Sequence, residues 1–157
     1  MSEKELDAMI REAVKLHGHL GPFLVLGVRM GMIANRVLNP TCNGGNMSQA
    51  TVKLPLRTPY SCILDGLQST TGCTIGNQRL KTEDSPEEMT AEFKMQGSDK
   101  SLIITTSPIM IDEIENEFSR GTTNEELAAK IASAPEDQLF ELKRQLTTRA
   151  ASVRGKR

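Results

Sequence analysis

Aromatic residues are scarce in this sequence, which has four Phe, one Tyr and no Trp among 157 residues. Proteins that bind nucleic acid by base stacking need exposed aromatic rings, and this composition does not supply them. The sequence also has no large excess of positive or negative charge, because 19 basic and 20 acidic residues leave a net charge of −1. The chain as a whole therefore has no field that attracts nucleic acid or an anionic membrane, and neither is an expected partner.

Long hydrophobic runs and disulfide patterns are absent as well. The longest apolar segment, residues 22–38, contains Arg29 near its middle and is too short and too charged to span a bilayer. The first residues, SEKELDAMIREAV, do not have the basic, apolar and small-residue regions of a secretory signal. Three cysteines are an odd number and do not indicate a disulfide framework. We therefore expect a cytoplasmic protein with reduced thiols.

The length predicts one main domain, and a chain of this size buries roughly 70% of its unfolded surface, enough for a core without disulfides. Ser2 and Glu5 form a capping-box pattern that predicts a helix over 3–17, which Gly18 ends. A second, mostly apolar helix is expected over 22–38, with proline at its first position. Its glycines at positions 27 and 31 leave a flat stripe that favours close packing with another element.

The remaining chain alternates between strand and helix patterns. We expect a loop over 39–47, a strand over 50–56 and a short helix capped by Ser61 or Thr58. A hairpin of strands 89–95 and 102–106 follows, and then a helix from Pro108 to Phe118. Two further helices are expected to start near Asn124 and Pro135, and the second of them carries Leu139, Phe140, Leu142 and Leu146. The predicted fold class is α+β, with a small antiparallel sheet packed against helices and a helical C-terminal extension. Residues 1–120 form the expected core, and 121–157 the extension with its basic tail.

Both histidines of the chain lie in one short motif, His17-Gly18-His19. The glycine between them gives the backbone the freedom to turn both imidazoles toward a common point, which a regular helix does not allow. Such a pair is either a binding site or part of a structural turn, and the motif alone leaves both open.

A second group of reactive side chains lies in residues 62–77, CILDGLQSTTGCTIGN. Cys62 is expected in the first helical turn, where backbone N–H groups stabilise a thiolate, and Asp65 shares its helix face. Cys73 follows in the next loop. Buried cysteines are also common as small apolar residues, and the spacing of these two matches no zinc knuckle. Cys42, in a Gly/Asn-rich loop outside both groups, is interpreted as incidental.

Histidine together with cysteine is the ligand chemistry of zinc and similar divalent metals. The candidate metal ligands are His17, His19, Cys62 and Cys73, and the candidate catalytic residues are Cys62 and Asp65. Three protein ligands would leave one coordination position for water or substrate. The sequence contains no P-loop, dinucleotide-binding fingerprint, nucleophile elbow or HExxH motif.

The blocks LHGHLGPFLVLGVRMG (16–31) and CILDGLQSTTGCTIGN (62–77), followed by AEFKMQGSDKSLIITT, resemble the formylmethanofuran dehydrogenase E-subunit family over residues 12–110. The resemblance implies an α+β core that forms homodimers and occurs beside or within enzymes that interconvert carbon dioxide and a formyl group on methanofuran. The dehydrogenase subunits are then expected partners. It also implies a metal or active site at the positions of His17, His19, Cys62, Asp65, Gly72, Cys73 and Thr74. From the His and Cys ligand chemistry, the expected metal is zinc or another divalent transition metal such as nickel or iron.

Two departures from the family pattern matter. Many members carry cysteine where this chain has Gly21, so one potential ligand is missing. Many also end in a cysteine-rich zinc module, whereas no cysteine follows Cys73 here. Three hypotheses result: an enzyme-like metal protein in C1 metabolism and methanogenesis, a non-catalytic accessory subunit of a molybdenum or tungsten dehydrogenase, and a metal-free thiol catalyst with Cys62 as nucleophile.

Overall fold

The computed structural model describes residues 2–38 and 47–146 of the chain. Its elements, in order, are α1 (Glu3–His17), α2 (Pro22–Leu38), β1 (Met47–Leu54), α3 (Cys62–Thr71), β2 (Leu80–Asp84), β3 (Thr90–Met95), β4 (Lys100–Thr106), α4 (Pro108–Ser119), α5 (Asn124–Ser133), α6 (Glu136–Leu139) and β5 (Phe140–Leu146). This combination confirms the predicted α+β class. The expected loop before β1, including Cys42, and the basic tail after β5 lie outside the described residues, apart from Met47 at the end of that loop, which begins β1.

The strands form one sheet in the order β2-β1-β3-β4-β5. The pairs β1–β3, β3–β4 and β4–β5 are antiparallel, and the β3–β4 pair is the expected hairpin. Strand β2, however, runs parallel to β1, so the sheet is mixed rather than purely antiparallel. A parallel neighbour requires a crossover connection, and α3 lies within the segment that links β1 to β2.

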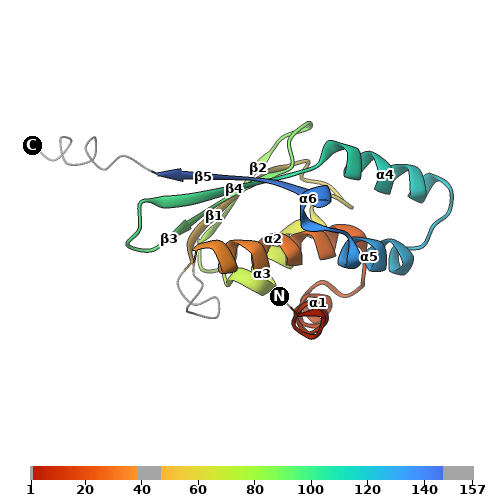
Figure 1. Cartoon of the computed structure of the whole chain (residues 1–157), viewed down its shortest axis with the longest axis horizontal. Helices are drawn as coiled ribbons and strands as arrows, with labels where there is room; N and C mark the ends of the chain where they lie inside the picture. The colour runs from red at the N-terminus through yellow and green to blue at the C-terminus, as the bar shows by residue number, and fades with distance from the viewer. Residues whose placement is uncertain (1, 39–46, 147–157) are drawn as a thin grey trace, which may run out of the picture.

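Helices α2 and α3 lie along one face of the sheet, and α1 lies beyond them (Figure 1). The strands turn alternate apolar residues toward these helices, among them Val52, Phe93 and Ile104, which are all buried. Helix α2 is buried on nearly every side, because it packs against α1, α3, α5 and the strands. The predicted central position of this helix is confirmed.

Glycines allow α2 and α3 to approach so closely that their backbones touch. A Cβ added at Gly27 would overlap the carbonyl oxygen of Ile63, and one added at Gly31 would overlap the Thr70 hydroxyl. On α3, a Cβ at Gly66 would lie 2.5 Å from the Leu24 carbonyl oxygen. The expectation of close packing along the glycine stripe is therefore confirmed.

Residues 140–146 correct the sequence-based expectation, because they form strand β5 and not a helix. Phe140 pairs with Thr106 and Leu146 with Lys100 along the edge of β4. The spacing of Leu139, Leu142 and Leu146 fits a helix, whereas Phe140, Leu142 and Leu146 fit the two-residue repeat of a strand, and pairing with β4 decides between them. Strand β2 is not predicted by the sequence analysis, because the strand lacks the alternation of apolar and polar residues that marks a half-buried strand. In the structure four of its five residues are exposed.

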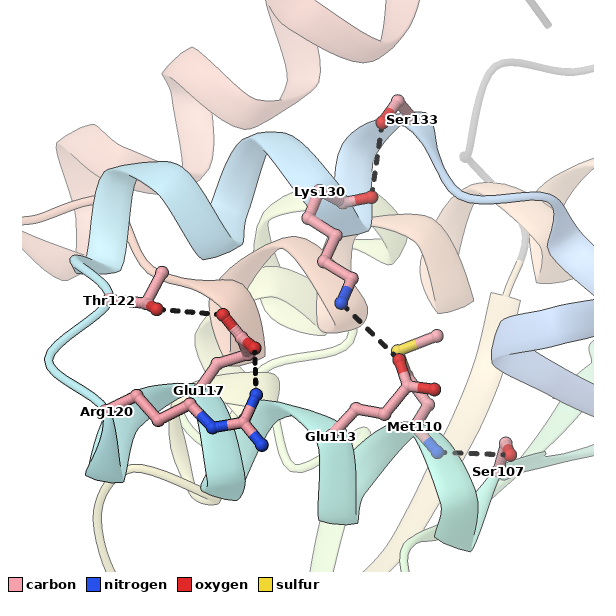
Figure 2. A network of polar contacts seen from close by, with 8 residues as sticks. All are labelled: Ser107, Met110, Glu113, Glu117, Arg120, Thr122, Lys130 and Ser133. Carbon is pink, nitrogen blue, oxygen red and sulfur yellow. Dashed lines mark hydrogen bonds and ion pairs between the residues drawn. The ribbon is translucent and has the colours of Figure 1, made fainter.

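Helix α4 is tied to α5 by polar contacts at the surface (Figure 2). Lys130 on α5 lies 3.5 Å from a carboxylate oxygen of Glu113 on α4. In the connection, the Thr122 hydroxyl donates to Glu117 at 2.8 Å, and Arg120 pairs with the same carboxylate at 3.3 Å. These contacts fix the turn that leads into α5.

Arg29 is a buried cation in the middle of the apolar α2. Its guanidinium donates to the carbonyl oxygens of Ile131, at 2.8 Å, and Ala134, at the C-terminal end of α5. Helix C-termini carry unpaired carbonyls and a partial negative charge, so this arginine supplies the missing donors. Burial lowers the pKa of Arg29, and the carboxylate of Glu136 counteracts that shift.

We expect Arg29→Met to lower the free energy of unfolding by about 3 kcal/mol, because the carbonyls at the end of α5 lose a charged donor inside the protein. Chemical denaturation measures the change. The matched control is Arg36→Met on the same helix, whose guanidinium pairs with Glu136 at 2.6 Å in a more exposed position. It should cost less than about 1 kcal/mol. Equal losses in the two variants would contradict this role for Arg29.

No helix in the described ranges is long and apolar enough to cross a membrane.

Candidate metal centre

The two histidines are placed by the end of α1. His17 is the last residue of the helix, and Gly18 ends it in the left-handed conformation, with φ of +102°. This turn lets His19 fold back, so that the two imidazole centroids lie 4.5 Å apart. The sequence-based expectation that glycine brings both rings to one place is confirmed.

Cys62 reaches the same place from the start of α3, which packs against α1. Donor atoms of His17, His19 and Cys62 all lie within 4.8 Å of one another. A tetrahedral zinc ion separates nitrogen and sulfur ligands by roughly 3.5 Å, so small side-chain rotations bring all three onto one ion. His19 is exposed and Cys62 is only 8% exposed, so the cluster opens to solvent on the histidine side.

Asp65 orients His17. The Nδ1–H of His17 donates to a carboxylate oxygen of Asp65 at 2.7 Å, and the side chain of His17 is 13% exposed. In the neutral imidazole this hydrogen bond leaves the lone pair on Nε2, an atom that is buried and has no partner among the described residues. A carboxylate behind a histidine whose other nitrogen is free is the usual arrangement around a metal-ligating imidazole. The donor set and the unpartnered Nε2 therefore fit a zinc-type ion.

The environment of Cys62 corrects one expectation. Burial raises the pKa of its thiol, and the carboxylate of Asp65 raises it further. The backbone N–H at the helix start acts in the opposite direction but does not prevail. The expected N-terminal cap is also incomplete, since Ser61 occupies the position without a side-chain hydrogen bond. Without a cation, this thiol is a poor nucleophile at neutral pH.

Cys73 lies elsewhere in the structure. It is fully buried in the core, and its thiol lies 3.8 Å from the carbonyl oxygen of Met47 on β1. The cluster formed by His17, His19 and Cys62 does not include it. Of the four proposed ligands, the structure thus brings three together.

Gly21 is buried and lies beside His19. A Cβ added there would lie 3.8 Å from Nε2 of His19 and 3.2 Å from the side-chain oxygen of Asn124. A side chain at this position would therefore lie beside His19 and press against Asn124.

Gln68 is a site residue that the sequence analysis did not identify. Its side-chain amide donates to the second carboxylate oxygen of Asp65 at 3.0 Å. Its position three residues after Asp65, on the same face of α3, was the available signal, but glutamine is common on helix surfaces.

A family model described as "FmdE, Molybdenum formylmethanofuran dehydrogenase operon" matches residues 16–149 of the chain. A crystal structure of a tungsten formylmethanofuran dehydrogenase FmdE-like protein from Syntrophus aciditrophicus superposes with a TM-score of 0.62 at 17% identity. The alignment covers 91% of this chain and 73% of that one, and supports the fold.

A curated relative from Archaeoglobus fulgidus, described as a probable S-adenosyl-L-methionine-binding protein, is 36% identical over 78 residues. The match covers 50% of this chain but only 21% of that relative. The chain therefore spans a small part of the relative's length.

Proposed function

Because this chain belongs to the FmdE family of the molybdenum formylmethanofuran dehydrogenase operon, we propose that it is a metal-binding protein of that C1 system. His17, His19 and Cys62 hold a zinc-type divalent ion in this proposal. The observation that carries it is the buried Nε2 of His17, which faces no hydrogen-bond partner among the described residues while its Nδ1 is fixed by Asp65. A buried imidazole nitrogen without a partner is costly unless a ligand occupies it.

Each residue has a separate part in the site. Asp65 fixes the tautomer and the ring orientation of His17, and makes that imidazole a better donor. Cys62 provides the single negative charge among the ligands, and its burial excludes water from that side. His19 lies on the exposed side of the site, where a small molecule can approach the ion.

Two imidazoles and one thiolate leave a tetrahedral ion with one open position and a net charge of about +1, which favours an anionic or carbonyl oxygen as the fourth ligand. A bound ion of this type polarises a carbonyl group or lowers the pKa of water. The third hypothesis, a metal-free thiol catalyst, is disfavoured by the raised pKa of Cys62. The reaction class that we infer is metal-assisted chemistry on a small C1-type substrate.

The test is elemental analysis of untagged protein by plasma mass spectrometry. We expect about one equivalent of zinc, nickel or iron in the wild type, and less than about a tenth of an equivalent in His17→Ala and Cys62→Ala. Cys73→Ala is the matched control, because it removes a buried thiol outside the cluster and should retain the metal. A folded wild type that remains metal-free after incubation with zinc would overturn the proposal and favour the accessory-subunit hypothesis.

A further inference from the structure

Three hydrogen bonds connect His17 to the loop that follows the C-terminal end of α3. His17 Nδ1–H donates to Asp65 at 2.7 Å, Gln68 Nε2–H donates to the other Asp65 oxygen at 3.0 Å, and the backbone N–H of Ile75 donates to Gln68 Oε1 at 3.0 Å. Both oxygens of the carboxylate and both ends of the glutamine amide are therefore used. Hydrogen bonds in series restrict each other's rotation, so His17 is held by the whole chain of contacts.

The side chain of Asn77 makes three hydrogen bonds that hold the loop at the end of this series. Its amide oxygen accepts from the backbone N–H groups of Thr74 and Arg79, each at 3.0 Å, and its amide nitrogen donates to the Gly72 carbonyl at 2.7 Å. The Thr74 hydroxyl in turn accepts from the Asn77 N–H at 3.1 Å. These contacts fix the position of the Ile75 N–H between them.

We propose that Gln68 is a positioning residue of the metal site, and that the loop 72–77 is its anchor. The inference rests on the proposed function, since it concerns the same site. An Asp65 carboxylate without Gln68 keeps only one fixed oxygen and turns about its side-chain bonds, so the imidazole of His17 loses its fixed direction. Metal binding and the order of the loop are then coupled, although none of the three proposed metal ligands lies in the loop.

The first experiment measures zinc affinity by competition with a chromophoric chelator. Outer partners of metal ligands typically contribute 10- to 100-fold in affinity, and we expect Gln68→Leu to weaken zinc binding about tenfold. The matched control is Asn35→Leu, because the Asn35 amide also contacts α3, donating to the Thr70 carbonyl at 2.9 Å, but has no link to Asp65. This control should keep zinc affinity within twofold. Equal affinities of Gln68→Leu and the wild type would overturn the inference.

A double-mutant cycle separates positioning from a general effect on the fold. If Gln68 acts through Asp65, then Gln68→Leu should change zinc affinity less than twofold in an Asp65→Ala background. An unchanged tenfold loss in that background would show that Gln68 does not act through the carboxylate, and would contradict the proposal.

Hydrogen exchange at the Ile75 amide gives the complementary readout. Zinc should slow this exchange in the wild type and have no effect on it in Gln68→Leu. Zinc binding by the wild type with no change at Ile75 would overturn the coupling while leaving the metal site intact. Failure of the wild type to bind zinc at all would instead refute the proposed function, so the two results are distinguishable.

Discussion

Alanine at Gly66 is expected to destabilise the protein by at least about 3 kcal/mol, the upper range for overpacking a core. The added Cβ would lie 2.5 Å from the Leu24 carbonyl oxygen and 2.6 Å from the Val28 nitrogen. Both are backbone atoms of α2, so no side chain can rotate away, and the two helices must separate. On an exposed helix the same substitution would stabilise by about 1 kcal/mol, so the sign itself tests the packing.

Chemical denaturation measures this effect, with Gly76→Ala as the control. Among the residues that the structure describes, a Cβ at Gly76 would meet only the Thr74 hydroxyl, at 3.9 Å, and this exposed variant should stay within about 0.5 kcal/mol of the wild type. Because Cys62 and Asp65 lie on the same helix, separation of α3 from α2 should also weaken metal binding. A Gly66→Ala protein as stable as the wild type would show that the helices do not touch in this way.

The local features of the fold were predictable because each is encoded by neighbouring residues. The capping box of Ser2 and Glu5 is present at the start of α1, and Gly18 ends that helix. The 89–106 hairpin follows from alternation around a turn. By contrast, β5 is defined by pairing with β4, and its exposed sequence carries no local signal that excludes a helix.

The same distinction applies to the site. His17, His19, Cys62 and Asp65 could be identified because their residue types are rare in the chain or reactive, and because they cluster in two motifs. The packing of α1 against α3 brings the two motifs together, and the spacing of residues in the sequence does not predict this tertiary contact. Cys73 shares a motif with Cys62, but its thiol lies in the core near Met47, since the loop after α3 turns inward there.

The pH dependence of metal affinity follows from the state of Cys62. Its thiol has a pKa raised by burial and by Asp65, so it is protonated at neutral pH in the metal-free protein. A metal ion must displace that proton, because the thiolate is the ligand form. Lowering the pH therefore favours the protonated, metal-free state, and affinity should fall about tenfold per pH unit from the thiol alone.

Between pH 8 and pH 6 we therefore expect the affinity for cobalt(II) to fall at least about 100-fold, measured from the thiolate charge-transfer absorption. The Cys62→Asp variant supplies a carboxylate that is already ionised over this range. Its cobalt affinity, measured by chelator competition, should therefore depend on pH less steeply than that of the wild type, by about one proton. Cys73→Ala should keep the full slope, since that thiol lies outside the cluster. Equal slopes in the wild type and Cys62→Asp would mean that Cys62 does not release its proton to the metal, and would remove it from the ligand set.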